Sequence, residues 1–138
     1  MMEDTILEVE NLRTSFATDA GSVQSVRGIT FHVGKGESLG IVGESGCGKS
    51  VTMLSIMGLL EDNASRQADA LLFDGEDLLK KSPREMRKIQ GNRIGMIFQD
   101  PMTSLNPLFT VGEQIRGPLM RHQKLSRKEA EKKALVML

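Results

Sequence analysis

One eight-residue stretch carries the clearest chemical signal in the sequence. Residues 43–50, GESGCGKS, match the pattern G-x-x-x-x-G-K-S/T, in which a glycine-rich turn leads into a helix. Successive backbone N–H groups of such a turn point into one concavity and bind phosphate oxygens, and glycine permits the dihedral angles that this requires. Lys49 adds a cation for the β- and γ-phosphates, and the Ser50 hydroxyl is a ligand suited to Mg²⁺. The stretch therefore predicts a site for a nucleotide.

The residues on either side predict the elements that position this loop. Residues 38–42 form a nearly continuous apolar run, so we expect a strand buried on both faces just before the loop. Residues 51–60 predict a helix that is apolar almost all round and therefore buried. The first turn of this helix adds unpaired N–H groups and the positive end of its dipole. Cys47 lies in this surrounding, and we interpret it as a small loop residue rather than a reactive thiol.

Strands and helices are both expected in the rest of the chain. Alternating apolar residues predict strands at residues 6–13, running on toward Phe16, and at residues 23–33. Residues 63–69 are polar and predict a loop. Further strands are expected at 70–73 and 93–98, and helices at 83–90, from Thr110 to about Arg121, and after the capping box at 126–129.

Composition restricts the class of protein. The chain has 138 residues, of which 39% are hydrophobic and 26% charged, which is typical of a soluble globular domain. Its longest nearly apolar run, residues 53–60, is far shorter than the roughly 18 residues that a membrane span needs. The acidic N-terminus lacks a secretory pattern, and a single cysteine fits a reducing compartment. We therefore expect a cytoplasmic location.

Charge is unevenly distributed along the chain. Residues 1–79 hold 5 basic and 13 acidic side chains, whereas residues 80–138 hold 13 basic and 5 acidic ones. A basic half can indicate a nucleic-acid partner. Here the basic residues lie on helix-like stretches without interleaved aromatic residues, so we expect a solvated or partner-facing surface and no nucleic acid.

Three further segments, taken with the loop, identify a family resemblance. They are FDGEDL at 73–78, IGMIFQDP at 94–101 and MTSLNPLFTVGEQI at 102–115. Together they resemble the ATP-binding subunits of ABC transporters, and most closely those of bacterial oligopeptide and dipeptide importers, in which GKSVT and a glutamine followed by DPMTSLNP recur. The resemblance covers essentially all 138 residues. It implies an α/β fold: a P-loop NTPase core with an antiparallel β subdomain over about residues 1–100, and the truncated start of a helical subdomain over about 101–138.

The resemblance also implies roles for individual residues. Phe16 matches the aromatic residue that stacks on adenine, although an ordinary core aromatic at a strand end is the open alternative. Gln99 matches the glutamine that touches Mg²⁺ and the attacking water. Val51 stands where threonine is frequent, and its backbone N–H serves the α-phosphate with either side chain. We therefore expect catalytic roles for Lys49 and Gln99, Mg²⁺ contacts from Ser50 and Gln99, and ATP contacts from Phe16, Gly43, Ser45, Gly46, Cys47, Gly48, Lys49, Ser50 and Val51.

A complete family member contains parts that this sequence lacks. We find no LSGGQ-type segment and no apolar run followed by Asp-Glu, and the last helix reaches Leu138 without a terminating signal. We therefore expect a piece of a longer polypeptide that binds ATP and Mg²⁺ but does not hydrolyse ATP alone. In the family, the full subunit pairs head to tail with a second ATP-binding subunit and acts on transmembrane permease subunits. It is peripheral to the cytoplasmic face of the inner membrane and powers peptide import.

Two alternatives remain open. One is a short non-catalytic nucleotide-binding or regulatory module. The other is an ABC-type ATPase that is not linked to transport, against which the segment FQDPMTSLNP argues because its form is that of the importers.

Overall fold

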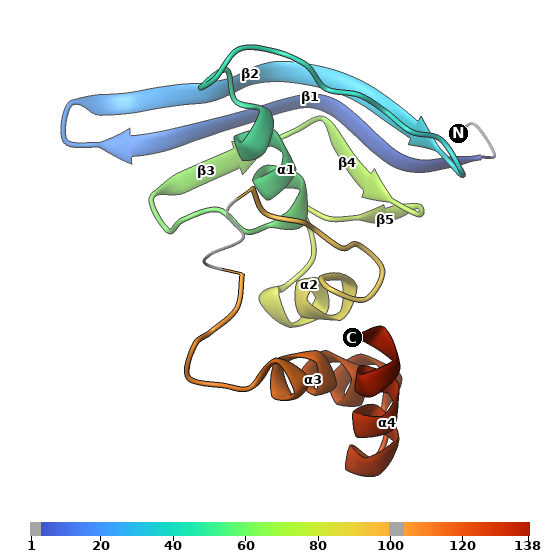
Figure 1. The fold of residues 1–138 in the computed structure, drawn as a ribbon. Helices are drawn as coiled ribbons and strands as arrows, with labels where there is room; N and C mark the ends of the chain where they lie inside the picture. The colour runs from blue at the N-terminus through green and yellow to red at the C-terminus, as the bar shows by residue number, and fades with distance from the viewer. Residues whose placement is uncertain (1–3, 100–103) are drawn as a thin grey trace. The chain divides into compact units, whose positions relative to one another are not determined.

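An antiparallel sheet forms the framework of the first part of the chain. The computed structural model describes residues 4–99 and 104–138 and divides into two units, Met1–Met86 and Arg87–Leu138. Within the described residues the sheet has five strands in the order β2-β1-β4-β5, and β3 also pairs with β1 (Figure 1). The strands are β1 (Thr5–Thr18), β2 (Gly21–Gly34), β3 (Ala64–Gln67), β4 (Ala70–Phe73) and β5 (Glu76–Asp77).

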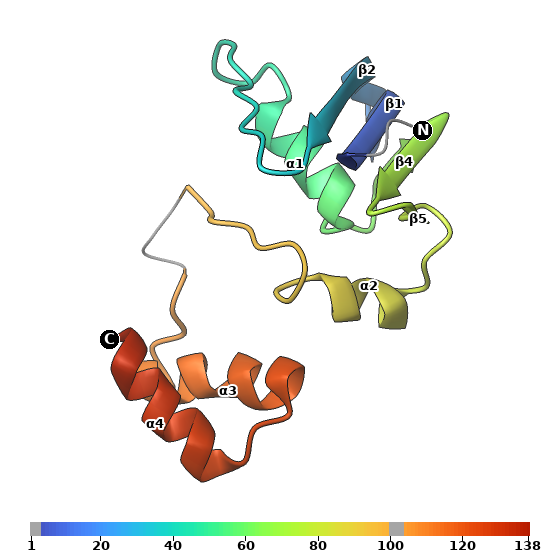
Figure 2. The same cartoon turned by 90° about the vertical axis from the view of Figure 1, so that its right-hand side faces the viewer.

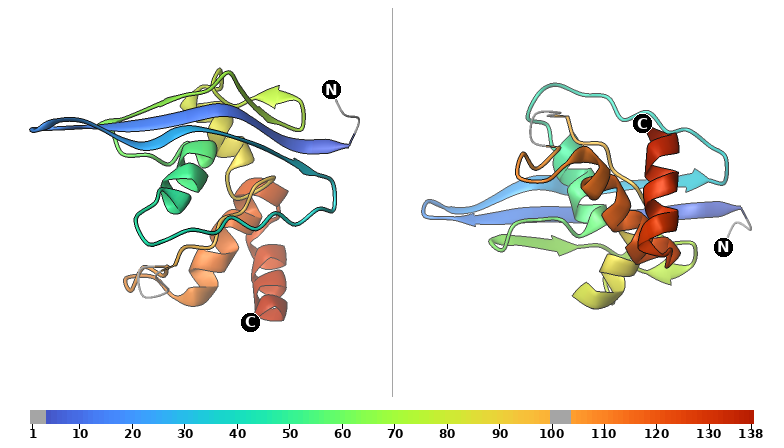
Figure 3. Two further views of the ribbon diagram at one scale, coloured as in Figure 1. Left: turned by 90° about the horizontal axis from the view of Figure 1, so that it is seen from above. Right: turned by 60° about the horizontal axis from the view of Figure 1, so that its bottom comes forward.

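The long β1–β2 hairpin confirms the first two strands expected from the sequence, and Figure 3 shows it from two directions. Its alternation is interrupted at Asn11, which has a left-handed φ of 50° and lies where the β1–β2 register shifts. Asparagine tolerates this conformation better than most residues. The interruption explains why Val9 and Leu12, three residues apart, are both fully buried and form the sheet core together with Leu71.

Strand β3 corrects the prediction of a loop at residues 63–69. Residues Ala64–Gln67 pair antiparallel with β1, so that Phe16 lies opposite Ala64 and Thr14 opposite Arg66. The segment ASRQ has no apolar alternation, and its strand conformation comes from the ladder that β1 offers rather than from its own composition.

Two predicted core strands are absent from the structure. Residues 38–42 and 95–98 have no strand assignment, and Ile94 forms only an isolated bridge with Gln90. Apolar side chains in both segments are exposed, with Val42 at 93% and Ile97 at 98% of full exposure. A strand needs a neighbour for its N–H and C=O groups, and among the described residues no strand of the sheet pairs with either segment.

Helix α1 (Lys49–Met57) lies against one face of the sheet, next to β1 and β2 (Figure 2). It buries one side, formed by Thr52, Ser55, Ile56 and Met57, and is not buried all round as its composition predicts. The Thr14 and Ser55 hydroxyl oxygens lie 2.7 Å apart, and both residues are buried. Arg66 of β3 donates to the carbonyl oxygens of Ser55 and Leu78. Burial lowers the pKa of the Arg66 guanidinium from its ordinary value.

The helices of the later chain begin at the positions predicted from the sequence. Helix α2 (Pro83–Ile89) follows Ser82, whose hydroxyl accepts a hydrogen bond from the Glu85 N–H. Helices α3 (Val111–Gln123) and α4 (Arg127–Met137) each begin with a complete capping box, at Thr110 and Ser126. These two helices pack on each other through Leu119, Ala130 and Ala134, together with Ile115 and Leu125. In the part of the chain that the structure describes, no helix has the length and apolarity to cross a membrane.

The buried hydroxyl pair gives a prediction for stability. Ser55 donates to the Val51 carbonyl oxygen at 2.6 Å, so its single proton is used and Thr14 is the donor between the two hydroxyls. Ser55→Ala leaves the buried Thr14 hydroxyl without an acceptor and should cost about 1–3 kcal/mol. Thr14→Val removes that donor and should cost less. Urea unfolding followed by circular dichroism measures both variants, and a smaller loss for Ser55→Ala than for Thr14→Val would contradict this assignment.

The capping boxes give a prediction for pH dependence. Hydrogen bonds from Thr110 and Ser126 lower the pKa of Glu113 and Glu129 from their ordinary values. A lowered pKa in the folded state stabilises the helices above the unfolded pKa, and this stabilisation is lost as pH falls through the folded pKa. Glu129→Gln should therefore be less stable than the parent near neutral pH. The difference should close in acid, which thermal unfolding at several pH values would measure, and a difference independent of pH would contradict it.

Candidate functional site

The glycine-rich loop at residues 43–48 leads directly into α1. Gly46 and Gly48 have left-handed φ angles of 81° and 95°, which most other residues adopt only with strain. Gly48 is the N-cap of α1, and its carbonyl oxygen accepts hydrogen bonds from the Thr52 N–H at 2.8 Å and the Thr52 hydroxyl at 2.9 Å. The first turn of α1 contains no acidic residue, so the positive end of the helix dipole is not offset there. The start of α1 therefore combines unpaired helix N–H groups with no nearby carboxylate, a geometry that favours anions.

Gly48 has a second reason to be glycine. Thr14 lies opposite Val26 and Ser15 lies opposite Gln24, so the β1–β2 register shifts there. Ser25 therefore has no residue opposite it on β1. The Ser25 carbonyl oxygen is directed at the start of α1, where a Cβ atom on Gly48 would lie 2.5 Å from it. Such a contact does not occur between real atoms, so the loop can approach β2 this closely only with glycine at position 48.

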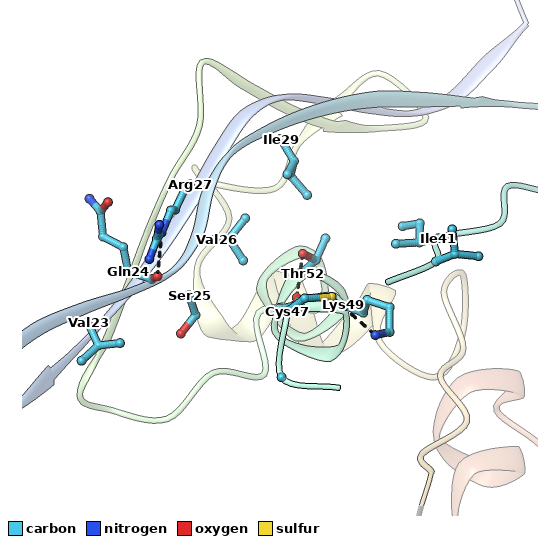
Figure 4. A pocket seen from close by; sticks show the side chains of 13 residues that line it. Val23, Gln24, Ser25, Val26, Arg27, Ile29, Ile41, Cys47, Lys49 and Thr52 are labelled. Carbon is cyan, nitrogen blue, oxygen red and sulfur yellow. Dashed lines mark hydrogen bonds between the residues drawn. The ribbon is translucent and has the colours of Figure 1, made fainter. Parts of the chain in front are cut away.

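Lys49 is held over the loop by the loop itself. Its Nζ donates to the carbonyl oxygens of Gly43 and Glu44, both at 2.6 Å, and lies 3.5 Å from Cys47 Sγ (Figure 4). An ammonium group has three donors, and these contacts place it within the turn rather than out in solvent. The arrangement brings a cation and the N-terminal end of a helix to one place, which is the combination that binds phosphate.

A cavity of about 610 Å³ adjoins the loop, within the range of small-molecule sites. Part of its wall is strand β2 and part is the start of α1, with Ile41 and Val42 from the unpaired segment (Figure 4). The residues around it are Val23, Gln24, Ser25, Val26, Arg27, Ile29, Ile41, Val42, Gly46, Cys47, Gly48, Lys49 and Thr52. Phe16 does not line the cavity. It is half-buried, and Val23, which lies opposite it in the β1–β2 register, does line the cavity.

The structure therefore brings together some of the residues expected from the sequence. Gly46, Cys47, Gly48 and Lys49 line the cavity, and Gly43 binds the lysine through its carbonyl. The other loop residues adjoin these four: Ser45 and Ser50 are exposed, and Val51 is half-buried. Cys47 is a free, exposed thiol.

Gln99 lies in the second unit, where it is exposed. The motif residues 100–103 that follow it, including the start of the expected helical arm at Met102, lie outside the described residues. The roles expected for Gln99 in catalysis and Mg²⁺ binding remain predictions.

Three residues at the site were not identified from the sequence. They are Ser25, which meets Gly48, Thr52, which binds its carbonyl, and Ser55, which joins α1 to β1. Ser25 and Ser55 act through contacts between segments far apart in the sequence, whereas Thr52 bonds to the carbonyl four residues earlier. The only sequence signal for Thr52 and Ser55 is a hydroxyl within an otherwise apolar helix.

Comparison with known proteins gives the same family as the motif. A family profile described as ABC transporter matches residues 26–137. The dipeptide transport ATP-binding protein DppD of Bacillus subtilis (strain 168) is 54% identical over 136 residues, covering 98% of this chain and 41% of its own. The oligopeptide transport ATP-binding protein OppD of the same organism is 50% identical over 134 residues, covering 96% and 37%.

Solved structures agree in fold. The ABC transporter cassette MJ0796, in a dimeric structure, superimposes with a TM-score of 0.79 at 24% identity and covers 94% of this chain and 54% of its own. A dimeric post-hydrolysis state of the same cassette, bound to ADP and Pi, gives a TM-score of 0.75 at 27% identity. The chain thus spans about 40% of the length of the curated relatives and about half of the cassette. By its profile match and its identity to these relatives, the chain belongs to the ABC transporter family, and it has the fold of part of an ABC transporter cassette.

Proposed function

We propose that this chain binds ATP with Mg²⁺ at residues 43–51, as part of an ATPase subunit that powers peptide import. The main support is the position of Lys49, whose ammonium group is fixed by two loop carbonyls beside a cavity that the loop and β2 share. This arrangement places a cation, helix N–H groups and a cavity in the size range of small-molecule sites together.

The residues present suit a Mg²⁺-nucleotide in three ways. Gly48 lets the loop lie against the Ser25 carbonyl oxygen of β2, which holds the start of α1 beside the cavity. The N–H groups at the start of α1 and the Lys49 ammonium would bind the phosphate oxygens. The exposed Ser50 hydroxyl, next to Lys49, would ligate Mg²⁺, which prefers oxygen ligands and supplies charge neutralisation at the phosphates.

Phe16 and Gln99 are the other two residues to which we assign roles, each from its own surroundings in the chain. Phe16 is half-buried near the C-terminal end of β1, opposite Val23 of the cavity wall. This position favours its assignment as the adenine platform. Gln99 would contact Mg²⁺ and the attacking water, consistent with its place in the motif IGMIFQDP. We also propose that the boundary between the nucleotide-binding core and the helical subdomain lies near residue 100.

The wider role rests on the relatives. DppD and OppD are named as dipeptide and oligopeptide transport ATP-binding proteins, and the MJ0796 cassette is dimeric. We therefore propose a second ATP-binding subunit and membrane permease subunits as partners, with a peripheral location at the cytoplasmic face of the inner membrane. The unpaired segments 38–42 and 95–98 favour further strands supplied by a longer polypeptide. Because this sequence contains no LSGGQ-type segment and no apolar run followed by Asp-Glu, we expect this chain alone to bind ATP and not to hydrolyse it.

The lysine provides the direct test. Lys49→Ala removes the cation at the loop and should weaken Mg²⁺-ATP binding at least about tenfold, because charge-assisted hydrogen bonds to phosphate are lost. Calorimetric titration measures this, with the exposed Lys35→Ala as the matched control that should bind like the parent. A parallel phosphate-release assay should stay at background for all three proteins. Binding that survives Lys49→Ala would overturn the site, and steady hydrolysis would overturn the expectation that this chain alone does not hydrolyse ATP.

Two glycines provide a matched steric test. Gly48→Ala should abolish ATP binding and destabilise the fold, since its Cβ would lie 2.5 Å from the Ser25 carbonyl oxygen. Gly46→Ala shares the left-handed conformation but has no atom within 4 Å of the added Cβ, so only backbone strain of roughly 1–2 kcal/mol should appear. Thermal unfolding and ATP titration compare the pair. Equal losses in both variants would show that the β2 contact does not matter.

A further inference from the structure

A chain of buried hydroxyl groups connects strand β1 to the first turn of α1. Thr14 donates to the Ser55 hydroxyl at 2.7 Å, and Ser55 donates to the carbonyl oxygen of Val51 at 2.6 Å. Thr14 is 1% exposed and Ser55 is 0% exposed, so water does not compete for these bonds. Val51 is the third residue of α1, directly after Lys49 and Ser50. This series of hydrogen bonds therefore ends at the turn of α1 that carries Lys49 and Ser50, the residues proposed to bind phosphate and Mg²⁺.

The other end of this series of hydrogen bonds, Thr14, is close to Phe16, the proposed adenine platform. Thr14 and Phe16 are two residues apart on β1, whose pairing with β3 is regular over both, so their side chains lie on the same face of the strand. A shift of β1 relative to α1 would move Phe16 with it. The Thr14–Ser55 bond thus links the strand of the base platform to the helix of the phosphate loop.

Two neighbouring contacts restrict movement around this bond. Arg66, which lies opposite Thr14 in the β1–β3 register, donates to the Ser55 carbonyl and to the Leu78 carbonyl. One guanidinium therefore connects α1 to the residue that follows β5.

The second contact lies on the other side of β1. Thr14 is opposite Val26 there, and the carbonyl of the adjacent Ser25 is directed at Gly48. Together with these two contacts, the hydroxyl bond holds α1 at one position along β1.

We propose that Thr14 and Ser55 are positioning residues that fix the spacing between the adenine platform at Phe16 and the phosphate loop. This inference rests on the proposed function, since it assumes that a nucleotide spans both. Burial alone would be served as well by two apolar side chains, whereas a hydroxyl pair adds a directional bond that selects one register. Neither residue touches the nucleotide, so their effect should be confined to ligands that engage both ends of the site.

The test compares two probes in the presence of Mg²⁺, ATP and inorganic tripolyphosphate, by calorimetric titration of the full chain. Thr14→Val keeps the shape of the side chain and leaves Ser55 bonded to Val51. It should weaken ATP binding about fivefold, the size of one lost hydrogen bond, and change tripolyphosphate binding less than about twofold. Thr14→Ser should restore the ATP affinity. Thr5→Val, at the opposite end of the same strand, is the matched control and should bind both probes like the parent.

A double-mutant cycle with Phe16 separates positioning from general stability. Phe16→Ala should lower ATP affinity, and Thr14→Val should have no further effect in that background. Equal weakening of both probes by Thr14→Val, or a fivefold loss that persists without Phe16, would overturn the positioning role. If the parent chain binds both probes and Thr14→Val changes neither, this inference fails while the proposed function stands. If the parent binds neither probe, the proposed function fails and this inference fails with it.

Discussion

The docking of α1 on the sheet is the constraint on which the rest of the site depends. Two contacts of different kinds establish it. The Ser25 carbonyl oxygen packs against Gly48 so closely that no side chain fits between them, and the buried Thr14 hydroxyl donates to Ser55. The first contact sets how near the helix lies to β2, and the second sets where along β1 it lies. The position of the start of α1, which forms one part of the cavity wall, follows from these two conditions.

Burying hydroxyl groups on α1 is possible because the helix itself satisfies them. The Thr52 and Ser55 side chains each donate to the carbonyl four residues earlier, those of Gly48 and Val51. A hydroxyl that is bonded within its own helix can enter a core at little desolvation cost. The apolar composition of residues 51–60 therefore misrepresents the buried face, half of which is polar. The same bonds direct the remaining lone pairs of Ser55 toward β1, where Thr14 uses one.

Features set by neighbouring residues could be predicted from the sequence, and features set by distant ones could not. The loop at 43–50, the helix start at Thr110 and the capping box at Ser126 are defined within a few residues, and the structure forms them as expected. Segments 38–42 and 95–98 have strand composition, but a strand exists only where another pairs with it. Conversely, Ala64–Gln67 has little strand character and becomes a strand because β1 has a free edge there. The Ser25 and Thr14 contacts require the register of the whole hairpin.

The connectivity of the sheet also has a consequence for how the chain folds. Strand β1 pairs with β2 on one side and with β3 and β4 on the other, so the segment between Gly34 and Ala64 leaves and re-enters the same sheet. That segment contains the glycine-rich loop and all of α1. Closing it costs chain entropy, which the β1–β3 and β1–β4 pairings must offset. A ligand that binds this segment in the folded chain and not in the unfolded chain therefore stabilises the whole sheet, by an amount that grows with the ratio of its concentration to its dissociation constant.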